Sequence, residues 1–105
     1  MGTVELKDSQ WRDFIQTEYA VIDCYGDQCV ACVMLAPYYD AVADELNGIR
    51  FGRVNITQHP DIAEAFGIMS MPTLLFFRKG EKVHEISGSM EREELLSHVA
   101  KLLYE

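Results

Sequence analysis

Two apolar segments separated by one long helical repeat restrict the fold more than any other feature of the chain. Residues 20–25, Ala-Val-Ile-Asp-Cys-Tyr, are mostly apolar, which is typical of a strand covered on both faces in a parallel sheet. Apolar residues then recur every three or four positions over residues 32–46, and this predicts a helix that ends near Gly48. Residues 49–55 form the next predicted strand. The region therefore predicts a right-handed βαβ unit and an α/β fold.

Further elements are predicted on both sides of this unit. Residues 3–6 suggest an edge strand, and Asp8 and Ser9 are suited to capping a first helix. The apolar positions of that helix are Trp11, Phe14, Ile15 and Tyr19. Pro60 is suited to beginning a short helix that Gly67 ends.

The last third of the chain predicts a hairpin and a helix. Residues 73–77 and 82–87 read as antiparallel strands joined at Lys79 and Gly80, with a bulge expected between Val83 and Ile86. Acidic residues then precede an apolar stripe of helical spacing. The stripe consists of Leu95, Leu96, Val99, Leu102 and Leu103.

Length, charge and cysteine content narrow the class of protein. The chain has 105 residues and no Pro/Gly/Ser-rich linker, so we expect a single domain over residues 1–105. A formal net charge of −8 with scattered Lys and Arg argues against nucleic-acid binding. We expect no export signal and no membrane span, since no apolar run is long enough. Three cysteines, an odd number, favour a reducing compartment, so we expect a cytoplasmic protein, and a monomer by default.

Cys29 and Cys32 carry the strongest chemical signal. Two cysteines three residues apart at the start of a helix lie about one turn apart, so that their sulfurs can form a reversible disulfide. The unpaired N–H groups at the helix terminus favour a thiolate at Cys29, whereas Cys32 lies one turn inside. We therefore predict that Cys29 attacks a partner disulfide and that Cys32 resolves the mixed disulfide.

A Cys-x-x-Cys motif is also half of a zinc site, and zinc binding is the main alternative to a redox role for this pair. The other half is missing, because Cys24 lies in a predicted strand and the three histidines stand singly. An iron–sulfur cluster shared between two chains has no further support. We accordingly expect no metal and no bound cofactor, the redox group being the Cys29–Cys32 disulfide.

Asp23 is the second informative residue. A carboxylate inside an apolar strand is costly unless it has a partner or a task, and burial should raise its pKa. Asp23 could take the proton from Cys32 during resolution. In the alternative interpretation it turns to solvent or pairs with Arg53. Arg53 and Pro37 are supporting residues, the second because it predicts a kink in the cysteine helix.

Several separated motifs resemble the thioredoxin family in the right order along almost the whole chain. Residues 21–25 and the Cys-Val-Ala-Cys site resemble its Val-Asp-Phe-Trp strand and Trp-Cys-Gly-Pro-Cys site. Met-Leu-Ala-Pro at residues 34–37 is similar to its Met-Ile-Ala-Pro helix, and residues 53–56 to its Lys-Leu-Asn-Ile strand. Residues 67–74 resemble its Gly-Ile-x-x-x-Pro-Thr-Leu segment.

This resemblance implies a thioredoxin fold, a five-stranded mixed sheet flanked by four helices. It implies a cis peptide bond before Pro72, which lies opposite the cysteines, and a client strand bound by the backbone of Met71. Gly88 is expected beside the client groove. The implied partners are a flavin-containing thioredoxin reductase and client proteins that contain disulfides.

The departures from the family pattern concern the redox site. Gln28 replaces the tryptophan before the first cysteine, and a polar side chain therefore meets the client. Val30 and Ala31 replace Gly-Pro, which puts the reduction potential in question. Val33 replaces a frequent lysine and Asp27 adds negative charge, so we expect a less acidic Cys29.

We predict a thiol–disulfide oxidoreductase that reduces protein disulfides. Two alternatives stay open. The first is a binding module that keeps the fold while its cysteines are redox-silent. The second is a more oxidising disulfide oxidase or isomerase, because Val30 and Ala31 change the loop between the cysteines.

Overall fold

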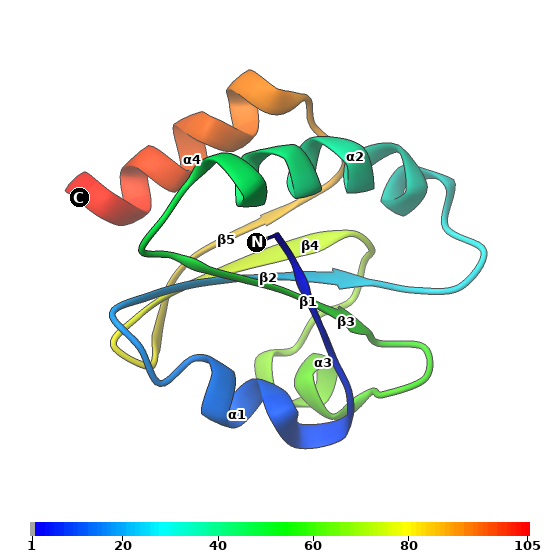
Figure 1. Cartoon of the computed structure of the whole chain (residues 1–105). Helices are drawn as coiled ribbons and strands as arrows, with labels where there is room; N and C mark the ends of the chain where they lie inside the picture. Colours follow the sequence, from blue (N-terminus) through cyan, green and yellow to red (C-terminus); the bar gives the residue numbers. More distant parts are fainter. Residues whose placement is uncertain (1) are drawn as a thin grey trace.

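Residues 2–105 are described by a computed structural model, and within them a five-stranded mixed sheet is flanked by four α-helices. The elements in chain order are β1 (Val4–Leu6), the short 3-10 helix η1 (Asp8–Gln10), α1 (Trp11–Phe14), β2 (Tyr19–Tyr25), α2 (Val30–Glu45), β3 (Arg50–Asn55), α3 (Asp61–Phe66), β4 (Thr73–Arg78), β5 (Glu81–Ser87) and α4 (Arg92–Tyr104). Figure 1 shows α2 and α4 on one face of the sheet and α1 and α3 on the other. This arrangement confirms the predicted fold class.

The strand order is β1-β3-β2-β4-β5, which places β2 at the centre. β2 and β3 are parallel and are connected through α2, as the apolar pattern predicts. β4 runs antiparallel to β2 on the other side, and β5 is antiparallel to β4 at the sheet edge. The loop after β2, which carries the first cysteine, therefore leaves the middle of the sheet.

The two faces of β2 belong to two separate cores. Val21 packs with Leu35 and Tyr39 of α2. Ala20, Ile22 and Cys24 instead join the core beneath α1 and α3. Side chains alternate along a strand, so Asp23 shares the α2 face with Val21. Cys24 is buried on the opposite face, as the alternation predicts.

Tyr39 fixes α2 above the two central strands. Its side chain is fully buried, and its hydroxyl lies 2.8 Å from the Gly52 carbonyl oxygen and 3.1 Å from that of Val21. Burying one such side chain contributes about 1.5–3 kcal/mol. Because the hydroxyl donates to β2 or β3, the middle of α2 has a defined position over these two strands, one of which carries Asp23.

The first helix differs from its prediction in the residues that begin it and in the residue at which it ends. The Asp8 and Ser9 side chains do not cap it; the Gln10 side chain instead accepts a hydrogen bond from the Lys7 N–H at 2.8 Å. Asp8 has a φ of 49°, within the left-handed region. Tyr19 lies in β2 opposite Arg78, not in the helix, because pairing with β4 outweighs helical spacing.

The C-terminal half agrees with the prediction in its main features. Gly67 ends α3 with a φ of 64°, and Lys79 and Gly80 form the hairpin turn with positive φ. A bulge is present in β5, but it lies at Val83 and not between Val83 and Ile86. Phe76 pairs with His84 and Phe77 with Lys82, which leaves Val83 as the extra residue. The edge position of β5 permits this irregularity.

Two further predictions concern helices. Pro37 lies inside α2, and the kink expected there stays a prediction. Over residues 2–105, no helix combines the length and the apolar character needed to cross a membrane.

Candidate active site

Cys29 and Cys32 form a disulfide at the start of α2, with their Cα atoms 5.3 Å apart. Cys29 has an extended backbone and is the N-cap of the helix, and its sulfur accepts a hydrogen bond of 3.2 Å from the Cys32 N–H. This N–H belongs to the helix end that has no partner within the helix, so the first sulfur takes the usual place of a capping oxygen. The same position favours negative charge on Cys29 when the bond is reduced.

The two sulfurs differ in their access to solvent. Cys29 is half-buried, whereas Cys32 is only 2% exposed. Cys32 lies one turn before Leu35, on the side of α2 that packs on the sheet. A partner can therefore reach Cys29 first, while Cys32 is shielded by its own helix.

A second segment borders the site at the start of β4. The peptide bond between Met71 and Pro72 is cis, as the resemblance implies. Pro72 is buried and Met71 is 37% exposed. The Gly88 N–H donates to the Pro72 carbonyl at 2.8 Å, and the φ of 103° at Gly88 suits a glycine. Met71 and Pro72 before β4 are thus joined to Gly88 after β5 by a hydrogen bond, while client binding by these residues stays a prediction.

Gly26 links this segment to the cysteine loop. A Cβ atom at Gly26 would overlap the Met71 sulfur and lie 2.5 Å from the Thr57 hydroxyl oxygen. The Thr57 hydroxyl is itself held, because it accepts the Asp27 N–H at 3.1 Å. The Met71 side chain therefore packs over a position where only a hydrogen atom fits.

We expect Gly26→Ala to disturb both client binding and stability. The flexible Met71 side chain can move aside, but the Thr57 hydroxyl is held by the Asp27 N–H, so the free energy of unfolding should fall by about 1–3 kcal/mol. The displaced Met71 should raise the KM for a client disulfide severalfold, measured by steady-state reduction kinetics. Met71→Ala removes the overlapping sulfur, so adding it to Gly26→Ala should recover part of the lost stability. An unchanged KM would show that the position of Met71 does not matter for the client.

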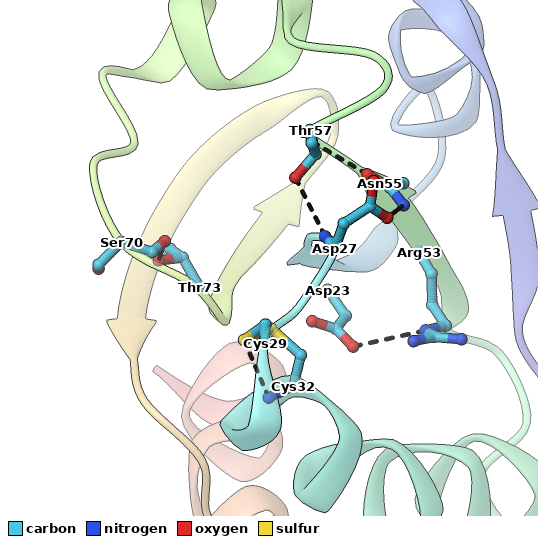
Figure 2. The surroundings of a disulfide bond; sticks show 9 residues. All are labelled: Asp23, Asp27, Cys29, Cys32, Arg53, Asn55, Thr57, Ser70 and Thr73. Atoms are coloured by element: carbon cyan, nitrogen blue, oxygen red, sulfur yellow. Dashed lines mark hydrogen bonds and ion pairs between the residues drawn. A yellow bond between two sulfur atoms is a disulfide. The ribbon is translucent and has the colours of Figure 1, made fainter.

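A hydrogen-bond network orders the loop before Cys29, a role that the local sequence pattern does not predict for its residues. The Asn55 amide donates to the Asp27 carboxylate at 3.0 Å, and its oxygen accepts the Thr57 and Gln58 N–H groups. Figure 2 shows Asp27, Asn55 and Thr57 gathered above the cysteines. A buried asparagine at the end of a strand was the available signal. The negative charge of Asp27 is partly compensated by its donors.

Asp23 is fully buried and lies opposite Arg53 across the β2–β3 pair. The Arg53 Nε lies 3.6 Å from Asp23 Oδ2, an ionic contact longer than a hydrogen bond. Within the part of the chain that the structure describes, neither carboxylate oxygen receives a hydrogen bond. Burial raises the pKa of Asp23 to about 7, although the Arg53 charge acts in the lowering direction. The expected rise is confirmed, together with the alternative contact to Arg53, whereas exposure of Asp23 to solvent is wrong.

Asp23 and Cys32 occupy the same layer between the sheet and α2. Asp23 enters it from β2 and Cys32 from the helix, and both are buried. In the view of Figure 2 the Asp23 side chain lies between the disulfide and Arg53. The layer thus holds both a buried carboxyl whose pKa burial raises to about 7 and the buried member of the cysteine pair.

The site also carries apolar side chains that are open to solvent. Val30 is 75% exposed and Val33 is 72% exposed, and Gln28 next to Cys29 is exposed with a φ of 55°. The first turn of α2, between the cysteines, therefore presents a β-branched side chain to solvent. A contact between Gln28 and a client stays a prediction.

The zinc alternative receives no ligands from this arrangement. Among residues 2–105, no three or more His, Cys, Asp or Glu side chains are grouped so that they could hold a metal ion. Cys24 lies on the far face of the sheet from Asp23, and Cys29 and Cys32 are bonded to each other.

The comparisons with known proteins agree with this geometry. The family model described as Thioredoxin matches residues 2–101. The chain belongs to the thioredoxin family. It is 34% identical to a thioredoxin of Chlamydia caviae over 86 residues, which cover 82% of this chain and 84% of the relative. It is 31% identical to a thioredoxin of Staphylococcus saprophyticus over 104 residues, covering 98% and 100%.

Solved thioredoxins share the fold. The Malassezia sympodialis thioredoxin has a TM-score of 0.87 at 24% identity, covering 96% of this chain and 91% of that one. A mutant thioredoxin from Halobacterium salinarum has a TM-score of 0.88 at 22% identity, covering 96% and 90%. A thioredoxin-family chain with a Cys29–Cys32 disulfide at the start of α2 is a thiol–disulfide oxidoreductase whose redox group is its own cysteine pair.

Proposed function

We propose that this thioredoxin-family protein reduces disulfide bonds in client proteins through Cys29 and Cys32. The observation that carries the proposal is the asymmetry of the pair. One sulfur is accessible at a helix N-terminus, and the other is buried in the layer that holds Asp23. A nucleophile and a resolving thiol need these two environments.

In the first step the Cys29 thiolate attacks one sulfur of a client disulfide. A sulfur–sulfur bond forms between Cys29 and the client, the client bond breaks, and one client thiolate leaves. The Cys32 N–H, 3.2 Å from the Cys29 sulfur, helps to stabilise the attacking charge. The client contacts proposed for this step are Gln28, Met71, Pro72 and Gly88.

In the second step Cys32 attacks the Cys29 sulfur of the mixed disulfide. Asp23 takes the proton from the Cys32 thiol, and the second client sulfur leaves as a thiolate and gains a proton from solvent. Two electrons have then moved from the cysteine pair to the client. A carboxyl with a pKa of about 7 accepts a proton readily at neutral pH. Arg53 faces this carboxyl. Pro37 lies in α2, the helix that also contains Cys32.

The oxidised protein needs an electron donor for the next cycle. We propose a flavin-containing thioredoxin reductase in this role, as the family generally uses. The protein would act in the cytoplasm as a single-domain monomer over residues 1–105. Relatives named thioredoxin over at least four-fifths of the chain support the activity class.

The midpoint potential of the Cys29/Cys32 couple tests the direction of the reaction. The protein is equilibrated in defined thiol buffers, free thiols are trapped, and the oxidised fraction is measured by mass spectrometry. We expect one two-electron transition near about −270 mV, typical of a reducing thioredoxin. A value near about −180 mV or above would favour the oxidase or isomerase alternative. A cysteine pair that never exchanges with the buffer would favour the redox-silent module.

A further inference from the structure

A row of charged side chains crosses the α2 face of the sheet and ends at Asp23. Glu5 of the edge strand β1 lies opposite Arg53 of β3, and Arg53 lies opposite Asp23 of β2. Tyr25 follows Asp23 by two residues and so projects from the same face. The row thus runs from a carboxylate at the sheet edge, 44% exposed, to one that is fully buried.

Glu5, Tyr25 and Arg53 form a closed set of contacts, which we call the Arg53 clamp. The Arg53 guanidinium lies over the Tyr25 ring, 4.1 Å from its centroid. The Tyr25 hydroxyl donates to Glu5 Oε2 at 2.6 Å. The other Glu5 oxygen, Oε1, lies 4.0 Å from Arg53 Nη1. The guanidinium is therefore held by a ring face on one side and a carboxylate on the other.

Arg53 is shared between two carboxylates. Its Nη1 faces Glu5, and its Nε approaches Asp23 only to 3.6 Å. A charge-assisted hydrogen bond would be shorter, about 2.7–2.9 Å. We propose that Glu5 and Tyr25 are positioning residues that hold Arg53 just short of a hydrogen bond with Asp23, and so keep this carboxyl able to accept the Cys32 proton. The inference rests on the proposed reduction of client disulfides.

The direction of the effect follows from the groups around Asp23. The charged groups that act on its pKa are Arg53 from β3, Glu5 from β1 and Asp40 from α2. The other titratable neighbours are Cys24 and Tyr25 of β2 and Tyr39 of α2, and the Asp23 charge raises the pKa of each of them. Arg53 lowers the Asp23 pKa, whereas the negative charges of Asp40 and Glu5 raise it. If the clamp is released, Arg53 can move closer to Asp23 and favour its ionised form.

The test is a pH titration of the whole protein by NMR. The chemical shift of the Asp23 side-chain carboxyl carbon reports the protonation of this group. Glu5→Gln should lower the pKa of Asp23 by about 0.5–1 unit, because Arg53 is freed and one negative charge is lost. The pH midpoint of the resolving step should move down in parallel. Asp40→Asn is the matched control, since Asp40 also raises the Asp23 pKa, and more strongly than Glu5, through its charge. The clamp predicts a larger shift for Glu5→Gln than for Asp40→Asn, and the reverse order would overturn it.

A double-mutant cycle isolates the role of Arg53. In an Arg53→Met background, the additional Glu5→Gln change should move the Asp23 pKa by far less than it does when Arg53 is present. An equal shift in both backgrounds would show that Glu5 acts on Asp23 without Arg53, and the proposal would fall. Because the titration is measured without any client protein, its result does not depend on whether the protein reduces client disulfides. Failure of the proposed function would appear instead as wild-type protein that does not reduce client disulfides.

Discussion

Cys29→Ser should lower the rate of client disulfide reduction by more than about 1,000-fold. A serine hydroxyl at the start of α2 is not ionised at neutral pH, so no nucleophile of comparable strength remains to attack the client. Cys32 cannot take over the first step, because it is 2% exposed and faces the sheet. The measurement is the rate of thiol release from a protein disulfide with a chemical reductant that regenerates the dithiol.

Two matched variants define what this loss means. Cys32→Ser should keep the first attack and stop the second, so a covalent client complex at Cys29 should accumulate and be visible by mass spectrometry. Cys24→Ala should retain activity, because this thiol is buried beneath the other face of the sheet and burial raises its pKa. Full activity in Cys29→Ser would contradict the mechanism.

Asp23→Asn should stabilise the protein increasingly as the pH rises. The pKa of Asp23 is about 7 in the folded protein and has an ordinary value of 3.8, so the folded state binds this proton more tightly. The stability that this difference contributes is fully present below pH 3.8 and is lost as the pH rises through about 7. The loss is on the order of 4 kcal/mol. Asparagine does not titrate, so the variant should escape this loss.

Urea unfolding of the oxidised proteins at several pH values tests this prediction. The difference in unfolding free energy between Asp23→Asn and wild type should grow by roughly 4 kcal/mol between pH 4 and pH 8. Asp13→Asn, which changes an exposed carboxylate on α1, serves as the control and should leave the pH dependence nearly unchanged. Parallel curves for Asp23→Asn and wild type would contradict the raised pKa. The variant should also resolve mixed disulfides about 100-fold more slowly, because its amide cannot take the Cys32 proton.

Local patterns were sufficient to predict most of the elements. The apolar run of β2 and the helical spacing of apolar residues in α2 are visible in short stretches of the chain, so local sequence is enough to predict both elements. The exceptions lie where non-local contacts compete with local spacing. Tyr19 fits a helical stripe, but its backbone pairs with β4. Asp8 is a good capping residue by type, but its side chain caps neither short helix, and the Gln10 side chain of the same turn accepts the Lys7 N–H instead.

The candidate site divides in the same way. The amino-acid sequence by itself determined the chemical groups: a pair of cysteines three apart at a helix start, and a carboxylate within an apolar strand. These depend on residue type and local spacing. Only the tertiary structure decided how Arg53 reaches Asp23, because the 3.6 Å separation depends on Glu5 and Tyr25, which lie on different strands. Likewise, the network of Asp27, Asn55 and Thr57 joins two loops about 30 residues apart. Such distances follow from the register of strands and the packing of α2 on them, which no local pattern in the chain specifies.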